Sequence, residues 1–235
     1  MEVIRLALSV RFNQVDIESA RQSNAELAVV IDVLRAFTVA PWVHHQGASK
    51  LWLTNTLDEA LQLKQRLGGA AIAMKDGDPA PGFGLTNSPD QISRLDLRGH
   101  QVVQRTTNGT VGVLAVSHVP MVMAASLVNV SATAQAIKAL QPKTVDLVVT
   151  GEGGTADEDL AAAEAIEALV VGPVDMGPFV ERVRRSAAAQ RLQDKQAAGH
   201  SGVGAKDVPM SLEVDRFSWV MQARFCDLGT RLEFS

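Results

Sequence analysis

Several short segments of this 235-residue chain are apolar at every position, without the alternation of a strand that has one solvated face. The clearest of them are 27–31, 102–103 and a run within 119–128, and segment 145–149 follows the same pattern apart from Asp146. Continuous apolar runs indicate strands buried on both faces, as in a sheet that helices cover. Shorter runs at 51–53 and 70–74 predict two further strands.

Segments with helical spacing alternate with these runs along the chain. They span 33–40, 56–67, 132–140 and 157–170. Thr56, with Glu59 three residues later, forms a capping-box signature, and Ser131 is placed to cap the third helix. Strands that alternate with helices imply a mostly parallel sheet. We therefore predict a three-layer α/β/α fold with a mostly parallel or mixed central sheet.

The remaining segments carry weaker patterns. Segment 76–89 is rich in Gly, Pro and Asp and is predicted to be a loop. Segment 179–197 reads as a charged, largely solvated helix, and alternation in 212–220 suggests a closing strand or turn. No linker precedes the late glycine-rich stretch. We therefore predict a single domain over 1–235, with room for two subdomains and a flexible segment at 198–205.

Composition narrows the class of protein. A hydrophobic content of 46% can bury a sizeable core, and the net charge of −4 comes with mixed acidic and basic residues. No basic run favours nucleic acid, no apolar run approaches the roughly 20 residues that span a bilayer, and no cleavable signal pattern begins the chain. The single cysteine, Cys226, cannot form an internal disulfide and suits a reducing compartment. We expect a cytoplasmic protein that binds neither nucleic acid nor membrane.

Polar residues follow the predicted strands at the point where each strand ends. Asp32, Asn129, the loop 106–110 and the segment 151–159 all hold such positions. In α/β sheets of this kind, ligands bind beyond the carboxyl ends of the strands. We therefore expect the functional site at this edge of the sheet.

The loop after the strand at 102–103 offers the densest group of hydrogen-bond donors. Its candidate substrate-binding residues are Arg105, Thr106, Thr107, Asn108, Gly109 and Thr110. If a helix begins here, its first N–H groups favour an anion, and Arg105 could add a bidentate partner for phosphate or sulfonate. A capped turn is the alternative. Asn129 is a further candidate, as are Asn87 and Ser88, for which a simple turn is again the alternative.

Asp32 is the carboxylate that the sequence marks most strongly for chemistry. It ends a buried strand, where a charge is unfavourable unless it is paired or bound to a metal. Capping the next helix is the alternative role. Arg35, about one turn further on, could clamp a substrate oxyanion or pair with Asp32.

Five segments together resemble the 2-phosphosulfolactate phosphatase family. They are VVIDVLRAFT (29–38), GFGLTNSP (82–89), TTNGT (106–110), SLVN (126–129) and GEGGTADEDL (151–160). Their order and spacing are like those of the family, and the similarity covers most of the chain to about residue 169. The resemblance implies a Mg²⁺-dependent hydrolase that releases phosphate from 2-phospho-3-sulfolactate, a small anionic substrate, in coenzyme M synthesis. A homodimer is one assembly compatible with it.

The resemblance also implies the metal ligands and one departure from the family. Asp32 with the pair Glu158 and Asp159 would hold Mg²⁺, which prefers oxygen ligands; for the pair, favourable interaction with a helix dipole is the alternative. Met74 and Lys75 stand where the family has Glu and Arg, and Gly84 stands where it has aspartate. Asp76 and Asp78 are the candidates to replace the missing acid. A divergent member that binds an anionic metabolite without catalysis is therefore the alternative function.

Overall fold

The computed structural model describes residues 10–235, which contain ten strands and ten α-helices. The strands are β1 (Arg11–Val15), β2 (Leu27–Ile31), β3 (Lys50–Thr54), β4 (Ala71–Lys75), β5 (Phe83–Thr86), β6 (Gln101–Arg105), β7 (Met121–Ala125), β8 (Thr144–Val149), β9 (Met221–Cys226) and β10 (Gly229–Phe234). The helices are α1 (Ile17–Ala20), α2 (Ala36–His45), α3 (Leu57–Leu67), α4 (Pro89–Ile92), α5 (Gly109–Ala115), α6 (Val130–Leu140), α7 (Asp157–Val171), α8 (Gly177–Arg185), α9 (Ala187–Ala197) and α10 (Asp207–Ser211). Two short 3₁₀ helices, η1 (Leu127–Asn129) and η2 (Glu152–Gly154), lie before α6 and α7.

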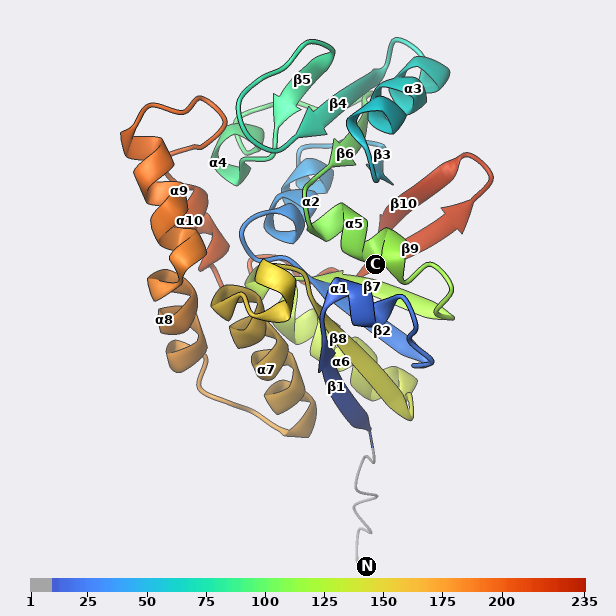
Figure 1. Ribbon diagram of the computed structural model, residues 1–235, viewed down its shortest axis with the longest axis vertical. Helices are drawn as coiled ribbons and strands as arrows, with labels where there is room; N and C mark the ends of the chain where they lie inside the picture. The colour runs from blue at the N-terminus through green and yellow to red at the C-terminus, as the bar shows by residue number, and fades with distance from the viewer. Residues whose placement is uncertain (1–9) are drawn as a thin grey trace, which may run out of the picture.

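The strands form one sheet in the order β1-β8-β2-β7-β9-β10-β3-β6-β4-β5 (Figure 1). Strands β1, β8, β2 and β7 are parallel to one another, and so are β3, β6, β4 and β5. The hairpin β9–β10 joins these two groups through antiparallel pairs with β7 and with β3. The prediction of a three-layer α/β fold with a mixed sheet is therefore confirmed.

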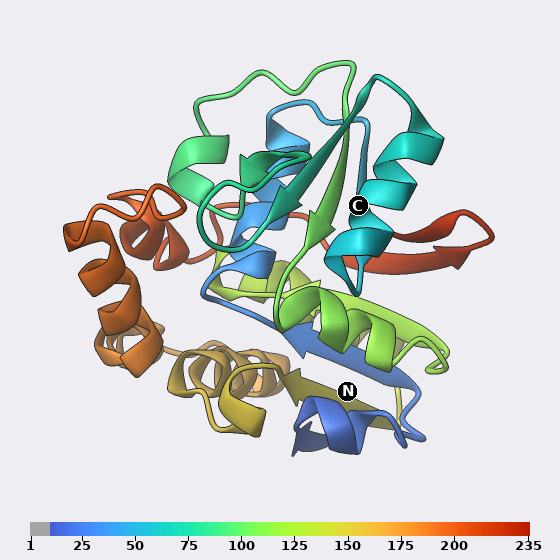
Figure 2. The same ribbon diagram turned by 45° about the horizontal axis from the view of Figure 1, so that its top comes forward.

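The hydrophobic core is divided by the faces of the sheet. On β2, Leu27, Val29 and Ile31 face the cluster formed with α6, α7 and α8, while Ala28 and Val30 face the opposite cluster. That second cluster contains residues of α2 and α5 and also residues of β3 and β6. Figure 2 shows α2 and α5 between the two strand groups, so these helices pack the groups together. Complete burial of all five residues of β2 explains its apolar sequence.

Several predicted boundaries are correct. β2 covers 27–31, and the helix predicted at 56–67 is α3, which has the capping box of Thr56 and Glu59 in full. The strand predicted at 145–149 is β8 and the helix at 157–170 is α7, each within a residue. These elements are the ones in which local propensity and burial agree.

Other boundaries were wrong for identifiable reasons. The helix after β7 begins at Val130, because η1 precedes it; Ser131 does not cap it but donates its hydroxyl to Asp215 at 2.6 Å. The predicted helix 179–197 is broken at Ser186, which has an extended backbone and caps α9 by accepting the Ala189 N–H at 3.1 Å.

Four strands were not predicted, the first of them β1. The segment 76–89 contains β5, which is four residues long and includes a glycine, so it gives little signal. The segment 212–220 forms turns, and the closing strands β9 and β10 follow it. Among residues 10–235, no helix has the length and apolar character that crossing a bilayer requires.

Candidate active site

Carboxyl ends of both strand groups meet at one place. Asp32 follows β2, and Asp76 follows β4. Asp76 is held from two neighbouring strand ends, because Thr107 donates its N–H to Oδ2 at 2.7 Å and Asn87 donates Nδ2–H to Oδ1 at 2.8 Å. Gln104 of β6 donates Nε2–H to Asn87 Oδ1 at 3.1 Å. The predicted location of the site, beyond the strand ends, is therefore rich in polar side chains from separate elements.

Asp32 lies deep in this region with only 7% of its surface exposed. Its Oδ1 accepts the N–H of Ala36 at 3.0 Å, so the carboxylate anchors the start of α2. A side chain at Gly109 would place a Cβ atom 2.7 Å from Asp32 Oδ2, and this close approach requires glycine. Burial, followed by the negative charges of Asp76 and Glu158, raises the pKa of Asp32 to about 7.

Asp159 and Glu158 lie beside Asp32 in the first turn of α7 and are also buried. Asp159 accepts the N–H of Val33 at 2.8 Å and that of Gly151 at 3.0 Å, so it links α7 to the ends of β2 and β8. Burial, and then the charge of Asp32, raises the pKa of Asp159 well above its usual value. Burial likewise raises the pKa of Glu158. The three acids thus form a group whose negative charges oppose one another; we call it the carboxylate cluster.

The carboxylate cluster is not a complete metal cage. Within residues 10–235, no three Asp, Glu, His or Cys side chains are arranged to hold one ion together. Both Asp159 oxygens already accept backbone N–H groups, which accounts for its orientation. The oxygen donors and the mutual repulsion fit a cation whose shell is completed by water and substrate rather than by protein alone.

Arg35 does not pair with Asp32. Its Nη1 donates to Asp207 Oδ2 at 2.5 Å and to the carbonyl of Gly202 at 2.9 Å, and both charged side chains are buried. The Asp207 carboxylate also accepts the Ser88 hydroxyl at 2.6 Å and the Gly204 N–H at 2.9 Å. Sequence analysis missed Asp207, because no local pattern links it to a residue 172 positions earlier.

The loop 106–110 directs many of its donors at the protein itself. Thr106 and Thr110 cap each other, since each backbone N–H reaches the other's hydroxyl oxygen at 3.0 Å. The Thr107 N–H is used by Asp76. Asn108 is half-buried, precedes α5 and makes no side-chain capping hydrogen bond. The Asn108 amide is thus not used in capping, while Thr107 is the residue of this loop that lines the cavity described below.

Two of the other candidates lie outside the carboxylate cluster. Arg105 donates Nε–H to the carbonyl of Asn55 at 3.3 Å, at the turn after β3. Asn129 accepts the Ser126 N–H at 3.1 Å and donates to the carbonyl of Trp219 at 3.2 Å, so it joins β7 to the C-terminal segment. Asn87 and Ser88 are brought into the site region, through Asp76 and Asp207 respectively.

A cavity of about 430 Å³ opens beside the carboxylate cluster. Its lining residues are Leu34, Arg35, Asp76, Gly77, Asp78, Thr107, Ala188, Arg191, Leu192, Lys195, His200 and Val203. Helix α9 supplies two of its cations, although the sequence predicted only a solvated helix there. In Figure 1 the helices α8 to α10 run along one side of the molecule from α7 to α4, which brings α9 to this cavity. We call it the cation-lined cavity.

The segment 198–205, predicted to be flexible, packs over the loop after β4. Asp78 accepts hydrogen bonds from His200 Nδ1 at 3.0 Å, the Ser201 hydroxyl at 3.1 Å and the Gly202 N–H at 2.9 Å. A Cβ atom on Gly202 would lie 2.2 Å from the Gly77 backbone, so only glycine fits there. The glycines of this segment therefore permit close contact. Of the two acids considered as replacements, Asp76 is the one at the carboxylate cluster, and Asp78 serves this contact.

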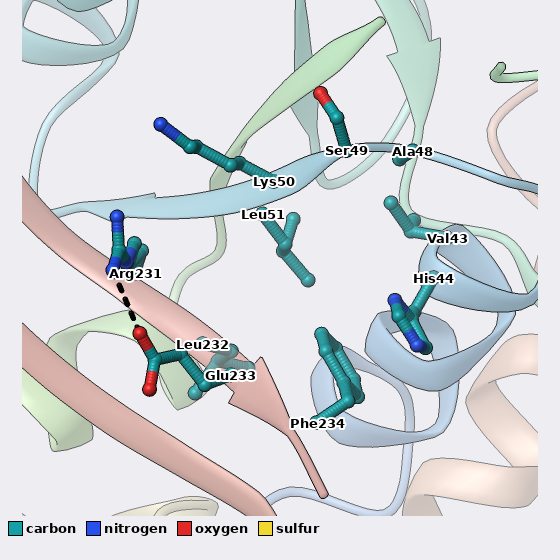
Figure 3. Close-up of a pocket in the computed structure, with 10 residues that line it drawn as sticks. All are labelled: Val43, His44, Ala48, Ser49, Lys50, Leu51, Arg231, Leu232, Glu233 and Phe234. Carbon is teal, nitrogen blue, oxygen red and sulfur yellow. Dashed lines mark hydrogen bonds and ion pairs between the residues drawn. The ribbon is translucent and has the colours of Figure 1, made fainter. Parts of the chain in front are cut away.

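A second cavity, of about 390 Å³, lies at the opposite end of α2 (Figure 3). There the His44 ring stacks on Phe234 with 4.3 Å between ring centroids. The one acid of its lining, Glu233, pairs with Arg231 at 2.7 Å. With its one acid paired and no second acid in its lining, this cavity lacks the group of opposing carboxylates found at the other end of α2.

A family model and individual relatives point to the same family over most of the chain. The family model of 2-phosphosulpholactate phosphatase matches residues 14–224. A Bacillus subtilis protein named probable 2-phosphosulfolactate phosphatase is 30% identical over 173 residues, which cover 72% of this chain and 76% of the relative. Proteins of the same name from Deinococcus radiodurans and Parasynechococcus marenigrum are each 34% identical, over 197 and 168 residues. These matches cover 81% and 68% of this chain and 82% and 68% of the relatives. On this evidence the chain belongs to the 2-phosphosulpholactate phosphatase family, whose members are phosphoric monoester hydrolases.

Proposed function

We propose that this chain is a Mg²⁺-dependent phosphatase that releases phosphate from a small phosphorylated sulfonate of the 2-phosphosulfolactate type. One observation carries the proposal: buried, mutually repelling carboxylates lie at the carboxyl ends of the strands, and Asp76, whose charge acts on one of them, lines a cation-lined cavity there. Such clusters of perturbed acids in a cleft are typical of catalytic sites. The matched relatives have the same activity in their names, which supports the proposed substrate class.

Asp32, Glu158 and Asp159 are the proposed source of the Mg²⁺ ligands, of which one or two would bind the ion at a time because the three are not arranged to hold it together. Mg²⁺ commonly takes one or two protein carboxylates and completes its shell with water and substrate phosphate oxygens, so the partial set is sufficient. When bound, the ion would supply Lewis-acid polarisation of the phosphoryl group. It would also offset the repulsion that raises the pKa values of Asp32 and Asp159.

The chain's own residues would position the ester. Asn108 is proposed to donate its side-chain amide to a phosphoryl oxygen. Arg35 lines the cavity while its Nη1 is committed to Asp207 and Gly202, so its remaining guanidinium N–H groups are the proposed oxyanion clamp. The net reaction adds water across the ester P–O bond and leaves inorganic phosphate and an alcohol. The exposed Cys226 is in keeping with the proposed cytoplasmic location.

A phosphate-release assay tests the proposal directly. The panel would contain phosphorylated sulfonates and phosphorylated hydroxy acids, each with Mg²⁺ and with excess chelator. We expect release with Mg²⁺ that is abolished by chelation and by Asp32→Asn. Binding without release for every ester would instead favour the alternative of a non-catalytic family member. Full turnover in excess chelator would remove the metal from the mechanism.

A further inference from the structure

Two cations of α9 share one wall of the cation-lined cavity. Arg191 and Lys195 are four residues apart on the helix, so they lie on the same face, and both line the cavity with Ala188 and Leu192 of the same helix. The break at Ser186 turns α9 away from α8, and α9 then packs against α10. The position of the two cations is thus a consequence of the fold rather than of a solvated surface helix.

The partners of these cations differ. Arg191 pairs with Glu152 at 2.5 Å, but both side chains are about half exposed, at 53% and 46%. Exposed pairs of this kind contribute little free energy, so an incoming anion can take the place of Glu152. No carboxylate lies within 4.0 Å of the Lys195 ammonium among residues 10–235. Lys195 therefore presents an uncompensated positive charge to the cavity.

The wall is connected to the carboxylate cluster through hydrogen-bonded neighbours. Glu152, the partner of Arg191, follows Gly151, whose N–H holds Asp159 at 3.0 Å. Thr107, on the other side of the cavity, holds Asp76 through its N–H at 2.7 Å. The lining itself includes Asp76, whose charge acts on Asp32, together with the α9 cations, so a small molecule in the cavity would meet both. A volume of about 430 Å³ lies within the range of small-molecule sites.

We propose that Lys195, assisted by Arg191, binds a non-reacting anionic group of the phosphate ester, either a sulfonate or a carboxylate. These two residues thereby select esters that carry a second anion over simple phosphate monoesters. The inference rests on the proposed function, since it assigns the other end of the same substrate. Both candidate groups are oxyanions that an ammonium and a guanidinium recognise by charge-assisted hydrogen bonds.

The kinetic test compares Lys195→Gln and Arg191→Gln with a control, Lys143→Gln, an exposed lysine that precedes β8 at the opposite end of that strand. The substrates are 2-phosphosulfolactate, isethionate phosphate (sulfonate only), 2-phospholactate (carboxylate only) and ethyl phosphate (neither). Lys195→Gln should raise KM about 10- to 100-fold for esters whose second anion it binds, with kcat within about twofold. Ethyl phosphate kinetics should not change. The single-anion ester that shows the larger effect identifies the group bound.

A binding experiment distinguishes failure of this inference from failure of the proposed function. Calorimetry would measure the affinity of 3-sulfolactate, which has no phosphate, for the wild type and for Lys195→Gln. If the wild type releases no phosphate but Lys195→Gln weakens this binding, the anion site stands and the phosphatase proposal fails. If the wild type is active and Lys195→Gln matches the Lys143→Gln control on every ester, the inference is overturned. An equal loss on ethyl phosphate, or no binding and no turnover in the wild type, also overturns it.

Discussion

Two buried charged groups lie three residues apart in the sequence and differ in how their charges are compensated. Arg35 pairs with Asp207 at 2.5 Å, and the carboxylate of Asp207 also accepts the Ser88 hydroxyl. Asp32 has no salt bridge among residues 10–235, and burial with the charge of Asp76 raises its pKa. A compensated pair can be explained as part of the fold. An uncompensated acid that faces further acids is destabilising by itself, and its retention points to a ligand.

The largest effect should come from breaking the compensated pair. Arg35→Met leaves Asp207 buried without its counter-charge, so we expect the free energy of unfolding to fall by about 3–5 kcal/mol. Urea denaturation would measure it. The control is Arg98→Met, which removes an exposed pair with Asp96 and should leave stability nearly unchanged. Equal stability of the two variants would show that the Arg35 pair does not support the fold.

Removing the uncompensated charge of Asp32 should lower turnover strongly without lowering stability. Asp32→Asn keeps an oxygen to accept the Ala36 N–H but removes the negative charge. We expect turnover to fall on the order of 10²–10³-fold, while thermal stability without metal stays equal or rises. The added stability that Mg²⁺ gives the parent should be lost. If the variant instead melts early and still responds to Mg²⁺, Asp32 is a helix anchor and the ion binds elsewhere.

The raised pKa of Asp32 predicts a pH dependence of stability in metal-free buffer. The native state holds a proton on Asp32 that the unfolded state releases near pH 4, so the unfolding free energy falls as pH rises from about 4 to 7. Between pH 5 and 8 the contribution of this residue should be about 2–3 kcal/mol. The unfolding free energies of the parent and of Asp32→Asn would be measured at pH 5 and at pH 8. Because all other groups titrate in both proteins, the difference between the two pH dependences is the contribution of Asp32. Parallel pH curves would contradict the assignment.

The smallest effects should come from the loop 106–110. Asn108→Ala should lower kcat/KM by roughly 10-fold, since its amide makes no capping hydrogen bond and is proposed to donate to the substrate. Thr107→Ala should change little, because the N–H that holds Asp76 is retained. Steady-state kinetics with thermal melts would distinguish the two. A larger loss for Thr107→Ala than for Asn108→Ala would assign the side-chain contact to the threonine.

The sequence was most informative where local pattern and tertiary position coincide. The apolar strands β2 and β8 and the acidic first turn of α7 could be recognised because burial on both faces and the strand-to-loop transition leave local signals. The family and the enzyme class inferred from the five segments are confirmed. The carboxyl ends of the strands were also the correct place to look for polar side chains.

The remainder of the site depends on contacts between distant segments. Asp207 reaches Arg35 across 172 positions, and α9 brings Lys195 to the cavity only because the chain bends at Ser186 and at the loop that Asp78 holds. Polar residues lie on several faces of α9, so its sequence does not indicate which face lines a cavity. For Arg35 the sequence offered Asp32 as a partner, and the nearer residue in sequence was not the one in contact.

The hairpin β9–β10 has a consequence for the order of synthesis. Among residues 10–235 it follows every other strand in the sequence, yet it alone pairs β7 of one group with β3 of the other. Until it leaves the ribosome, both strands present unpaired backbone edges, which are templates for association with other chains. The nascent protein is therefore expected to be most vulnerable to aggregation just before residues 221–235 emerge, and a chaperone would be most useful at that stage.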